Sequence, residues 1–117
     1  MGRRRPTPDV KSSNFMVREG AYRAAINMPI QGGAADLTKM AMSAVDEYLA
    51  GLRKAKSDDA KYPAQIMQVH ESVMVECAES EAEAISKQMV KIMENIKPAL
   101  GVKLKVDVEY AKNWGEL

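Results

Sequence analysis

The spacing of apolar residues along the 117-residue chain predicts two long helices. Between residues 34 and 53, and again between 79 and 97, apolar side chains recur every three or four positions and form one face of a helix. Ser80 and Glu83 have the spacing of an N-terminal capping box, and Pro98 and Gly101 end the second helix. The apolar positions are Leu37, Ala41, Ala44, Val45, Tyr48 and Leu52 in the first helix, and Ala82, Ile85, Met89, Ile92, Met93 and Ile96 in the second.

Two short apolar runs, 65–69 and 73–77, change the period from that of a helix to that of a strand. They flank a polar tripeptide, which predicts a β-hairpin with a tight turn. Residues 102–109 alternate apolar and charged side chains, which predicts a third, half-buried strand. We therefore expect an α+β fold in which helices pack on one face of a small antiparallel sheet.

The N-terminal part has weaker patterns. Residues 1–17 are predicted to form a basic, irregular leader, because its prolines interrupt regular hydrogen bonding. A short helix is expected from about Arg18 to Asn27, and Pro29 should end or bend it. The Gln-Gly-Gly segment at 31–33 is expected to separate it from the long helix. Near the other end, Trp114 is expected to pack back on the domain.

Length and composition indicate one soluble domain spanning residues 1–117, with 46% hydrophobic and 28% charged residues. No apolar run approaches the ~20 residues that span a bilayer, so no membrane partner is expected. Cys77 is the one cysteine, which excludes an internal disulfide and a thiolate zinc cage. We expect a cytoplasmic protein, associated with the nucleoid if the source is bacterial.

Charge is distributed unevenly although the net charge is only +1. Residues 1–56 hold ten basic against five acidic residues, and residues 57–117 hold seven against eleven. The basic excess is densest in the leader, at Arg3, Arg4 and Arg5. Such a segment indicates a polyanionic partner, with a merely solvated arm as the alternative.

The expected hairpin turn, His70-Glu71-Ser72, carries the residues best suited to chemistry. The imidazole could hydrogen-bond a phosphate or sugar, and the carboxylate could hold a divalent cation. An ordinary polar turn is the alternative interpretation. A Ser-His-Glu hydrolase lacks the Gly-x-Ser-x-Gly elbow, and Cys77 is expected to lie in an apolar strand, which disfavours nucleophilic catalysis. Gln31-Gly32-Gly33-Ala34 could receive a phosphate at a helix start, but lacks the spacing of a P-loop.

Arg23, Asn27 and Gln31 are spaced by four and share one face if the helix persists past Pro29. Arginine can bind phosphates, and amide side chains can contact acceptors in a minor groove. The alternative is an ordinary polar helix face.

Together these segments resemble the C-terminal end of family A DNA polymerases, the DNA polymerase I family, over nearly the whole chain. The leader residues Gly2-Arg3-Arg4-Arg5 and the run 8–14 are similar to the family's segment after its fingers. The block from Arg23 to Asp36 resembles a conserved family block, and residues 68–72 resemble motif C, usually Gln-Val-His-Asp-Glu. Met93-Glu94-Asn95 and Asn113-Trp114 also fit.

The resemblance implies a partial polymerase palm with motif C at the hairpin tip. In the complete enzyme, a motif C aspartate and a motif A aspartate bind catalytic Mg²⁺, and two cations promote nucleotidyl transfer from a deoxynucleoside triphosphate. Glu71 would then be the metal ligand and His70 would lie by the primer terminus. Arg23, Asn27 and Gln31, with Arg3, Arg4 and Arg5, would contact primer–template DNA. A role in DNA replication or DNA repair is implied.

Two departures from motif C matter. Glu71 replaces the usual aspartate and Ser72 replaces the usual glutamate, so the carboxylates are fewer and differently placed. No motif A segment or fingers helix is found in these residues. We therefore expect a fragment, a truncated gene product or one half of a split enzyme that is inactive without the remaining polymerase subdomains. The alternative is a non-catalytic nucleic-acid-binding or interaction module derived from the palm.

Overall fold

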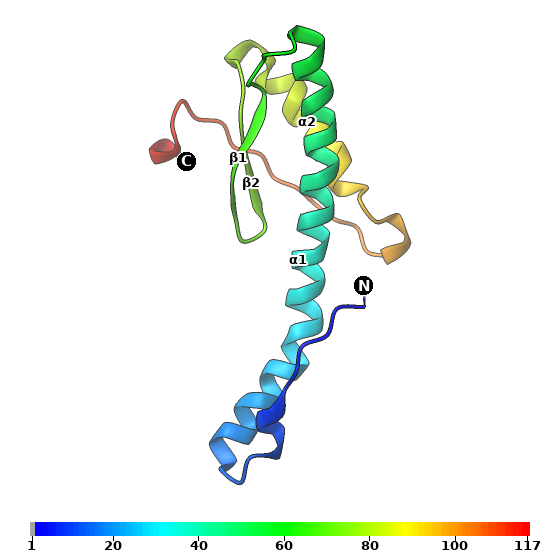
Figure 1. Cartoon of the computed structure of the whole chain (residues 1–117), viewed down its shortest axis with the longest axis vertical. Helices are drawn as coiled ribbons and strands as arrows, with labels where there is room; N and C mark the ends of the chain where they lie inside the picture. The colour runs from blue at the N-terminus through cyan, green and yellow to red at the C-terminus, as the bar shows by residue number, and fades with distance from the viewer. Residues whose placement is uncertain (1) are drawn as a thin grey trace. The chain divides into compact units, whose positions relative to one another are not determined.

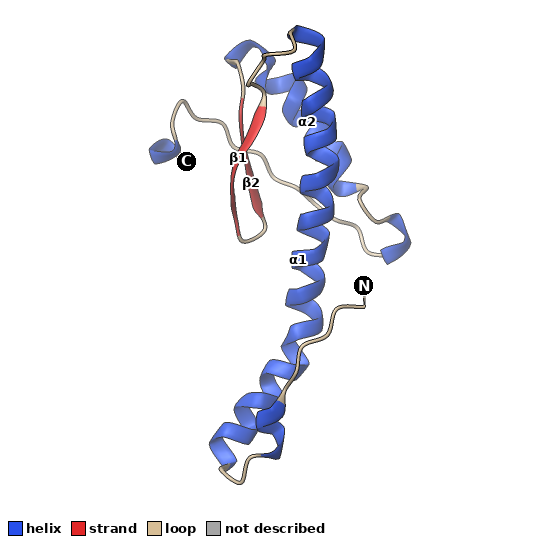
Figure 2. Ribbon diagram, viewed as in Figure 1, coloured by secondary structure: helices blue, strands red, loops and turns tan. Residues whose placement is uncertain are grey.

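The computed structural model describes residues 2–117 and contains two long helices and one β-hairpin (Figures 1 and 2). In chain order these are α1 (Phe15–Lys56), β1 (Ala64–Val69), β2 (Ser72–Glu76) and α2 (Ala82–Glu94). The predicted α+β class is confirmed. Short 3₁₀ turns lie at Pro8–Lys11, Glu79–Glu81, Pro98–Leu100 and Trp114–Glu116.

The chain divides into two compact units, residues 1–36 and 37–117, and the boundary falls within α1. Unit 1 contains the leader and the first part of α1. Unit 2 contains the rest of α1, the hairpin, α2 and the C-terminal segment. No helix of the described residues is long and apolar enough to cross a membrane.

Helix α1 is continuous, so the expected break at residues 31–33 is wrong. Pro29 lies inside the helix and cannot donate the backbone hydrogen bond to the Ala25 carbonyl. The neighbours on both sides of this stretch are strong helix formers, rich in alanine, methionine and leucine, and they carry the helix through. The low helix propensity of one proline and two glycines is thus outweighed by the surrounding residues.

The helix also begins earlier than Arg18, because Asn14 caps it. The Asn14 Oδ1 accepts hydrogen bonds from the backbone N–H of Met16 at 3.0 Å and of Val17 at 3.4 Å. An amide oxygen at this position satisfies N–H groups that have no partner within the helix. The last three residues of the expected irregular leader, 15–17, are therefore helical, and residues 8–11 form a 3₁₀ turn.

The core of unit 2 lies where α1 meets α2. Val45 and Leu49 are fully buried, and Ile85 of α2 packs against them. Thr38, Ala41, Val45 and Leu49 are the buried positions of α1, and they have the three- and four-residue spacing of one helix face. Ala41 and Val45 were among the predicted apolar positions of this face, whereas Thr38 and Leu49 were not. The partly buried side chains around this cluster are Tyr48, Leu52, Val75, Cys77, Met89, Ile92 and Met93.

The hairpin is antiparallel, and Val69 pairs with Ser72 across its turn. A register irregularity falls between Gln65 and Met67 in β1. At the base of the hairpin, the Gln65 side-chain amide donates to the Met42 carbonyl of α1 at 2.8 Å. The Arg53 guanidinium of α1 donates to the Pro63 carbonyl just before β1 at 2.7 Å. Two side-chain hydrogen bonds therefore join the start of the hairpin to α1.

The expected third strand does not form among the described residues. Within residues 102–109, Leu104 and Val106 are half-buried, whereas Val102 and Val108 are 67% and 41% exposed, so the predicted apolar face forms only in part. The backbone N–H of Val106 donates to the Glu94 carboxylate of α2 at 3.0 Å instead of to a strand. Alternation therefore predicted two of the four inward-facing side chains correctly, and it did not predict the backbone partner that defines a strand.

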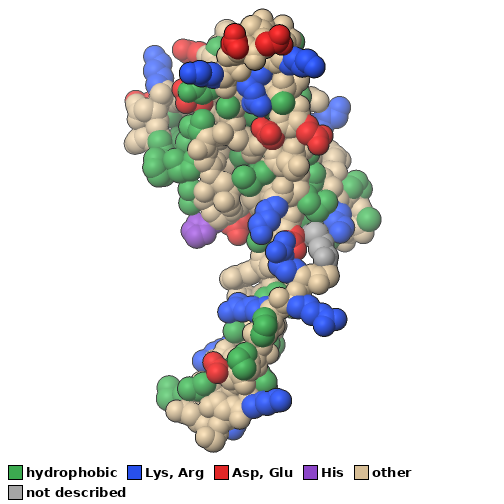
Figure 3. All heavy atoms as spheres, viewed as in Figure 1, with side chains coloured by type: hydrophobic (Ala, Val, Ile, Leu, Met, Phe, Trp, Pro, Cys, Tyr) green, Lys and Arg blue, Asp and Glu red, His purple; other side chains and the backbone are tan. Residues whose placement is uncertain are grey.

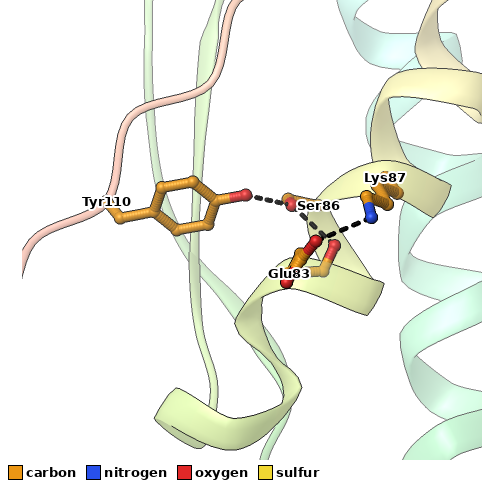
Figure 4. A network of polar contacts seen from close by, with 4 residues as sticks. All are labelled: Glu83, Ser86, Lys87 and Tyr110. Carbon is orange, nitrogen blue, oxygen red and sulfur yellow. Dashed lines mark hydrogen bonds and ion pairs between the residues drawn. The ribbon is translucent and has the colours of Figure 1, made fainter.

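Tyr110 holds the C-terminal segment on α2 (Figure 4). Its hydroxyl shares a hydrogen bond with the buried Ser86 hydroxyl, which also donates to the Glu83 carbonyl at 2.9 Å. Beside it, the Lys87 ammonium donates to the Glu83 carboxylate at 2.7 Å. This exposed pair lowers the pKa of Glu83 and raises the pKa of Lys87.

Two smaller expectations are wrong. The capping box does not form, because Ser80 lies in a 3₁₀ turn ahead of α2, whose N-cap residue is Glu81. The Glu83 side chain pairs forward with Lys87 rather than back toward Ser80. Trp114 is 61% exposed, so it does not pack on the domain.

Replacing Leu49 with alanine should destabilise the chain by about 2–5 kcal/mol, because it leaves a cavity at a fully buried site. Leu100→Ala is the matched control, since Leu100 is 40% exposed and surface changes usually lie within ~0.5 kcal/mol. Urea unfolding of both variants measures the difference. Equal losses for the two variants would contradict the described core.

The turn makes a second prediction. His70 has a positive φ of 51°, which the first residue of a two-residue hairpin loop requires. His70→Gly should keep or raise thermal stability, whereas His70→Val should lower it by about 1–2 kcal/mol, because a β-branched residue is strained at positive φ. Thermal unfolding followed by circular dichroism tests this. If valine is tolerated as well as glycine, the turn geometry is wrong.

Candidate functional site

The hairpin tip presents the two candidate catalytic residues, as the sequence predicted. His70 and Glu71 form the two-residue loop between β1 and β2, and both are exposed. The chain has one histidine, and Figure 3 shows its side chain on the surface in purple. Within residues 2–117, no hydrogen bond or ion pair engages the His70 imidazole or the Glu71 carboxylate. Both groups are therefore available to an external ligand.

The residues beside the tip close the turn. The Ser72 hydroxyl donates to the Val69 carbonyl at 2.7 Å, and the Gln68 side-chain amide donates to the His70 carbonyl. Ser72 is therefore engaged with backbone and not with His70, which gives no support to a Ser-His-Glu hydrolase. A non-glycine residue at positive φ, fixed by two such hydrogen bonds, is typical of a functional position.

Cys77 has the environment of a structural thiol. It packs on the core cluster directly after β2. Burial raises the pKa of the Cys77 thiol, Glu81 adds to this rise, and Lys56 opposes it. The thiol is therefore protonated at neutral pH, and the expectation that it is no nucleophile agrees with this environment.

The tip offers a divalent cation one carboxylate. Carboxylate oxygens are ligands that Mg²⁺ prefers, and Glu71 is exposed with no competing cation. No group of three or more His, Cys, Asp or Glu side chains among the described residues could by itself hold a metal ion. The donor set fits one ligand of a shared metal site rather than a complete site.

The second candidate set lies on α1 in unit 1. Because the helix continues past Pro29, the four-residue spacing places Arg23, Asn27 and Gln31 on one face, as predicted for a continuous helix. All three side chains are exposed. This face and the hairpin tip belong to different units of the chain.

The Gln-Gly-Gly segment cannot act as a phosphate-binding helix start. Residues 31–33 lie in the interior of α1, where backbone N–H groups bond within the helix. The phosphate interpretation of this segment is therefore wrong. Gln31 keeps only its side chain for an external contact.

The leader arginines differ from one another. The Arg3 guanidinium forms an ion pair with Asp36, at 3.1 Å from Nε and 3.0 Å from Nη2 to the same carboxylate oxygen. Arg4 and Arg5 are exposed, and no ion pair within the described residues engages them. The sequence did not single out Asp36 as the partner of Arg3, because 33 positions separate the two residues.

The matches to known proteins cover nearly the whole chain. The family model "DNA polymerase family A" matches residues 1–116. DNA polymerase I of Mycobacterium leprae is 41% identical over 98% of this chain. The thermostable DNA polymerase I of Thermus aquaticus is 36% identical over 97% of this chain. In both cases the match covers 12% of the relative, so the chain spans about an eighth of the length of these proteins.

A solved structure shares the fold. The POL domain of Pol1 from M. smegmatis, in complex with DNA primer-template and dNTP, is similar with a TM-score of 0.65 and 39% identity. The match covers 83% of this chain and 16% of that one. Agreement of sequence and fold over the same residues confirms the resemblance inferred from the motifs. The chain belongs to DNA polymerase family A.

Proposed function

We propose that the chain forms the motif C part of the palm of a DNA-directed DNA polymerase. It takes part in template-directed nucleotidyl transfer when the remaining polymerase subdomains are present. The observation that carries this proposal is the two-residue turn that exposes His70 and Glu71, at the position of motif C, in a chain about 40% identical to DNA polymerase I.

Glu71 is the proposed metal ligand at this tip, with Mg²⁺ as the cofactor of the complete enzyme. When bound, divalent cations stabilise the charge that develops on the attacking and leaving oxygens of a phosphoryl transfer. The glutamate side chain is one methylene longer than the aspartate usual in motif C. The rigid turn limits where its carboxylate can reach, since the neighbouring Ser72 hydroxyl and Gln68 amide bond to the backbone of the turn.

His70 is proposed to contact the primer terminus. Its φ of 51° gives its backbone the left-handed conformation that this two-residue turn needs. An exposed imidazole can donate a hydrogen bond to a phosphate or sugar oxygen. In this arrangement one hairpin supplies both the metal ligand and a primer contact.

Arg23, Asn27 and Gln31 are the proposed duplex contacts of α1, together with Arg4 and Arg5 of the basic leader. Amide side chains suit minor-groove acceptors, which are shared by all four base pairs and allow contact without reading sequence. The similar solved structure is a complex with DNA primer-template and dNTP, which supports primer–template DNA and a deoxynucleoside triphosphate as partners of the complete enzyme.

An apolar stripe on the first part of α1 supports a polypeptide partner, proposed to be the remaining polymerase subdomains. Phe15, Tyr22, Ile26 and Ile30 lie close to one line along the helix and are 44–76% exposed. Such a stripe is typical of a surface that another element covers. The relatives are about eight times longer than this chain and hold the residues that could do so.

A second candidate is a non-catalytic nucleic-acid-binding module. Ser72 replaces the second motif C carboxylate, which removes one potential metal ligand while leaving the basic leader and the α1 face intact. The two candidates differ in whether Glu71 is needed for DNA synthesis.

The intracellular location expected from the sequence stays a prediction.

Primer extension tests the catalytic proposal. The 117-residue chain alone, with Mg²⁺, primer–template and the four deoxynucleoside triphosphates, should give no extension, because one carboxylate cannot hold two cations. Adding a DNA polymerase I relative that ends before the matching segment should restore synthesis. In that mixture Glu71→Gln should lower the rate at least ~100-fold. The control is Glu79→Gln, an exposed acid of the 3₁₀ turn before α2.

Each result decides between the candidates. Robust synthesis by the chain alone would overturn its predicted inactivity. Restored synthesis that is equally fast with Glu71→Gln and Glu79→Gln would remove Glu71 as a metal ligand. Failure to restore synthesis, combined with salt-dependent duplex binding, would favour the non-catalytic module.

Duplex binding tests the α1 face. Arg23→Ala should weaken binding to primer–template DNA and lower the slope of log K against log salt by about 0.9, the value for one lost phosphate contact. Lys91→Ala, an exposed residue of α2 in unit 2, is the control and should leave the slope unchanged. Fluorescence anisotropy at several salt concentrations measures both. Equal slopes for the two variants would exclude Arg23 from the interface.

A further inference from the structure

Arg3 and Asp36 form the one ion pair among the described residues of unit 1. The Asp36 side chain is 12% exposed, while the Arg3 side chain is 66% exposed. Two guanidinium nitrogens, Nε and Nη2, approach the same Asp36 oxygen at 3.1 and 3.0 Å. A carboxylate this enclosed is costly to leave without its cation. The pair therefore favours the arrangement in which the leader lies along α1, which Figure 1 shows.

The other contacts of the leader are few. The Arg18 guanidinium donates to the Ser12 carbonyl at 3.3 Å, which holds only the last part of the leader beside the start of α1. Between Gly2 and Thr7, the Arg3–Asp36 pair is the one ion pair among the described residues. Arg4 and Arg5 follow it immediately and are exposed.

We propose that Asp36 is a positioning residue: by holding Arg3 it fixes the leader along α1 and presents Arg4 and Arg5 to the phosphates of a nucleic acid duplex. Arg3 itself is neutralised by Asp36 and makes no phosphate contact. The part that concerns DNA rests on the proposed function. The docking of the leader does not, because it is a property of unit 1 without a ligand.

Limited proteolysis of the full chain tests the docking without DNA. Asp36→Asn should speed tryptic cleavage between Arg4 and Arg5 roughly two- to fivefold, the range expected from loss of one weak to moderate ion pair. Asp9→Asn removes the same charge from an exposed acid of the leader and should have no effect. Cleavage after Lys105, in the exposed C-terminal segment, serves as the internal reference. The reversed pair Arg3→Asp with Asp36→Arg should restore slow cleavage.

Duplex binding tests the consequence. Arg4→Ala and Arg5→Ala should each lower the salt slope by about 0.9. Arg3→Ala and Asp36→Asn should each weaken binding two- to fivefold with no change of slope, and the double variant should be no weaker than either single variant. If Asp36 had only a structural role, Asp36→Asn would lower the stability of the chain but would not weaken duplex binding at an unchanged salt slope.

The outcomes separate the two proposals. Unchanged cleavage in Asp36→Asn, or no rescue by the reversed pair, overturns the positioning role. A steeper salt slope and tighter binding in Asp36→Asn also overturn it, because Arg3 would then be a phosphate-binding residue that Asp36 withholds. Faster cleavage without any duplex binding by the parent chain supports the docking of the leader and counts against the proposed function.

Discussion

The packing of α1 on α2 through Val45, Leu49 and Ile85 is the constraint on which the candidate site depends. A two-stranded hairpin is at best marginally stable in water by itself. Here Val75 and Cys77 pack against the same cluster, and Gln65 and Arg53 form hydrogen bonds that join the base of the hairpin to α1. The exposed tip can therefore keep a strained residue at positive φ, because the opposite end of the hairpin is held by buried side chains.

The two candidate regions have different physical characters. At the tip, two unpaired polar side chains stand on a turn closed by backbone and side-chain hydrogen bonds. On unit 1, an apolar stripe and a polar face run along the same helix, and an ion pair holds the basic leader beside them. The first arrangement suits a small, charged ligand such as a metal ion. The second suits large partners, a polypeptide on one side and a polyanion on the other.

Periodicity predicted those features that depend on which side chains are apolar. The hairpin, the position of His70 and Glu71 at its tip, and part of the inward face of α1 followed from spacing. The failures involve backbone partners that spacing does not contain. The continuity of α1 past Pro29 depended on the residues around it. Residues 102–109 have no neighbouring strand among the described residues, and the Val106 N–H bonds to the Glu94 carboxylate instead. Neither the Asn14 cap nor the pairing of Arg3 with Asp36 was predicted from the sequence.

Pro29 has a consequence for how α1 can move. The helix lacks one backbone hydrogen bond at this residue, and Gly32 and Gly33 follow within the next turn. Proline and glycine are the two residue types with the lowest helix propensity, so bending the rod here costs less elastic energy than bending it elsewhere. This compliant stretch lies just before the boundary between the two units. A single uninterrupted helix can thus behave mechanically as two stiff segments joined by a softer one.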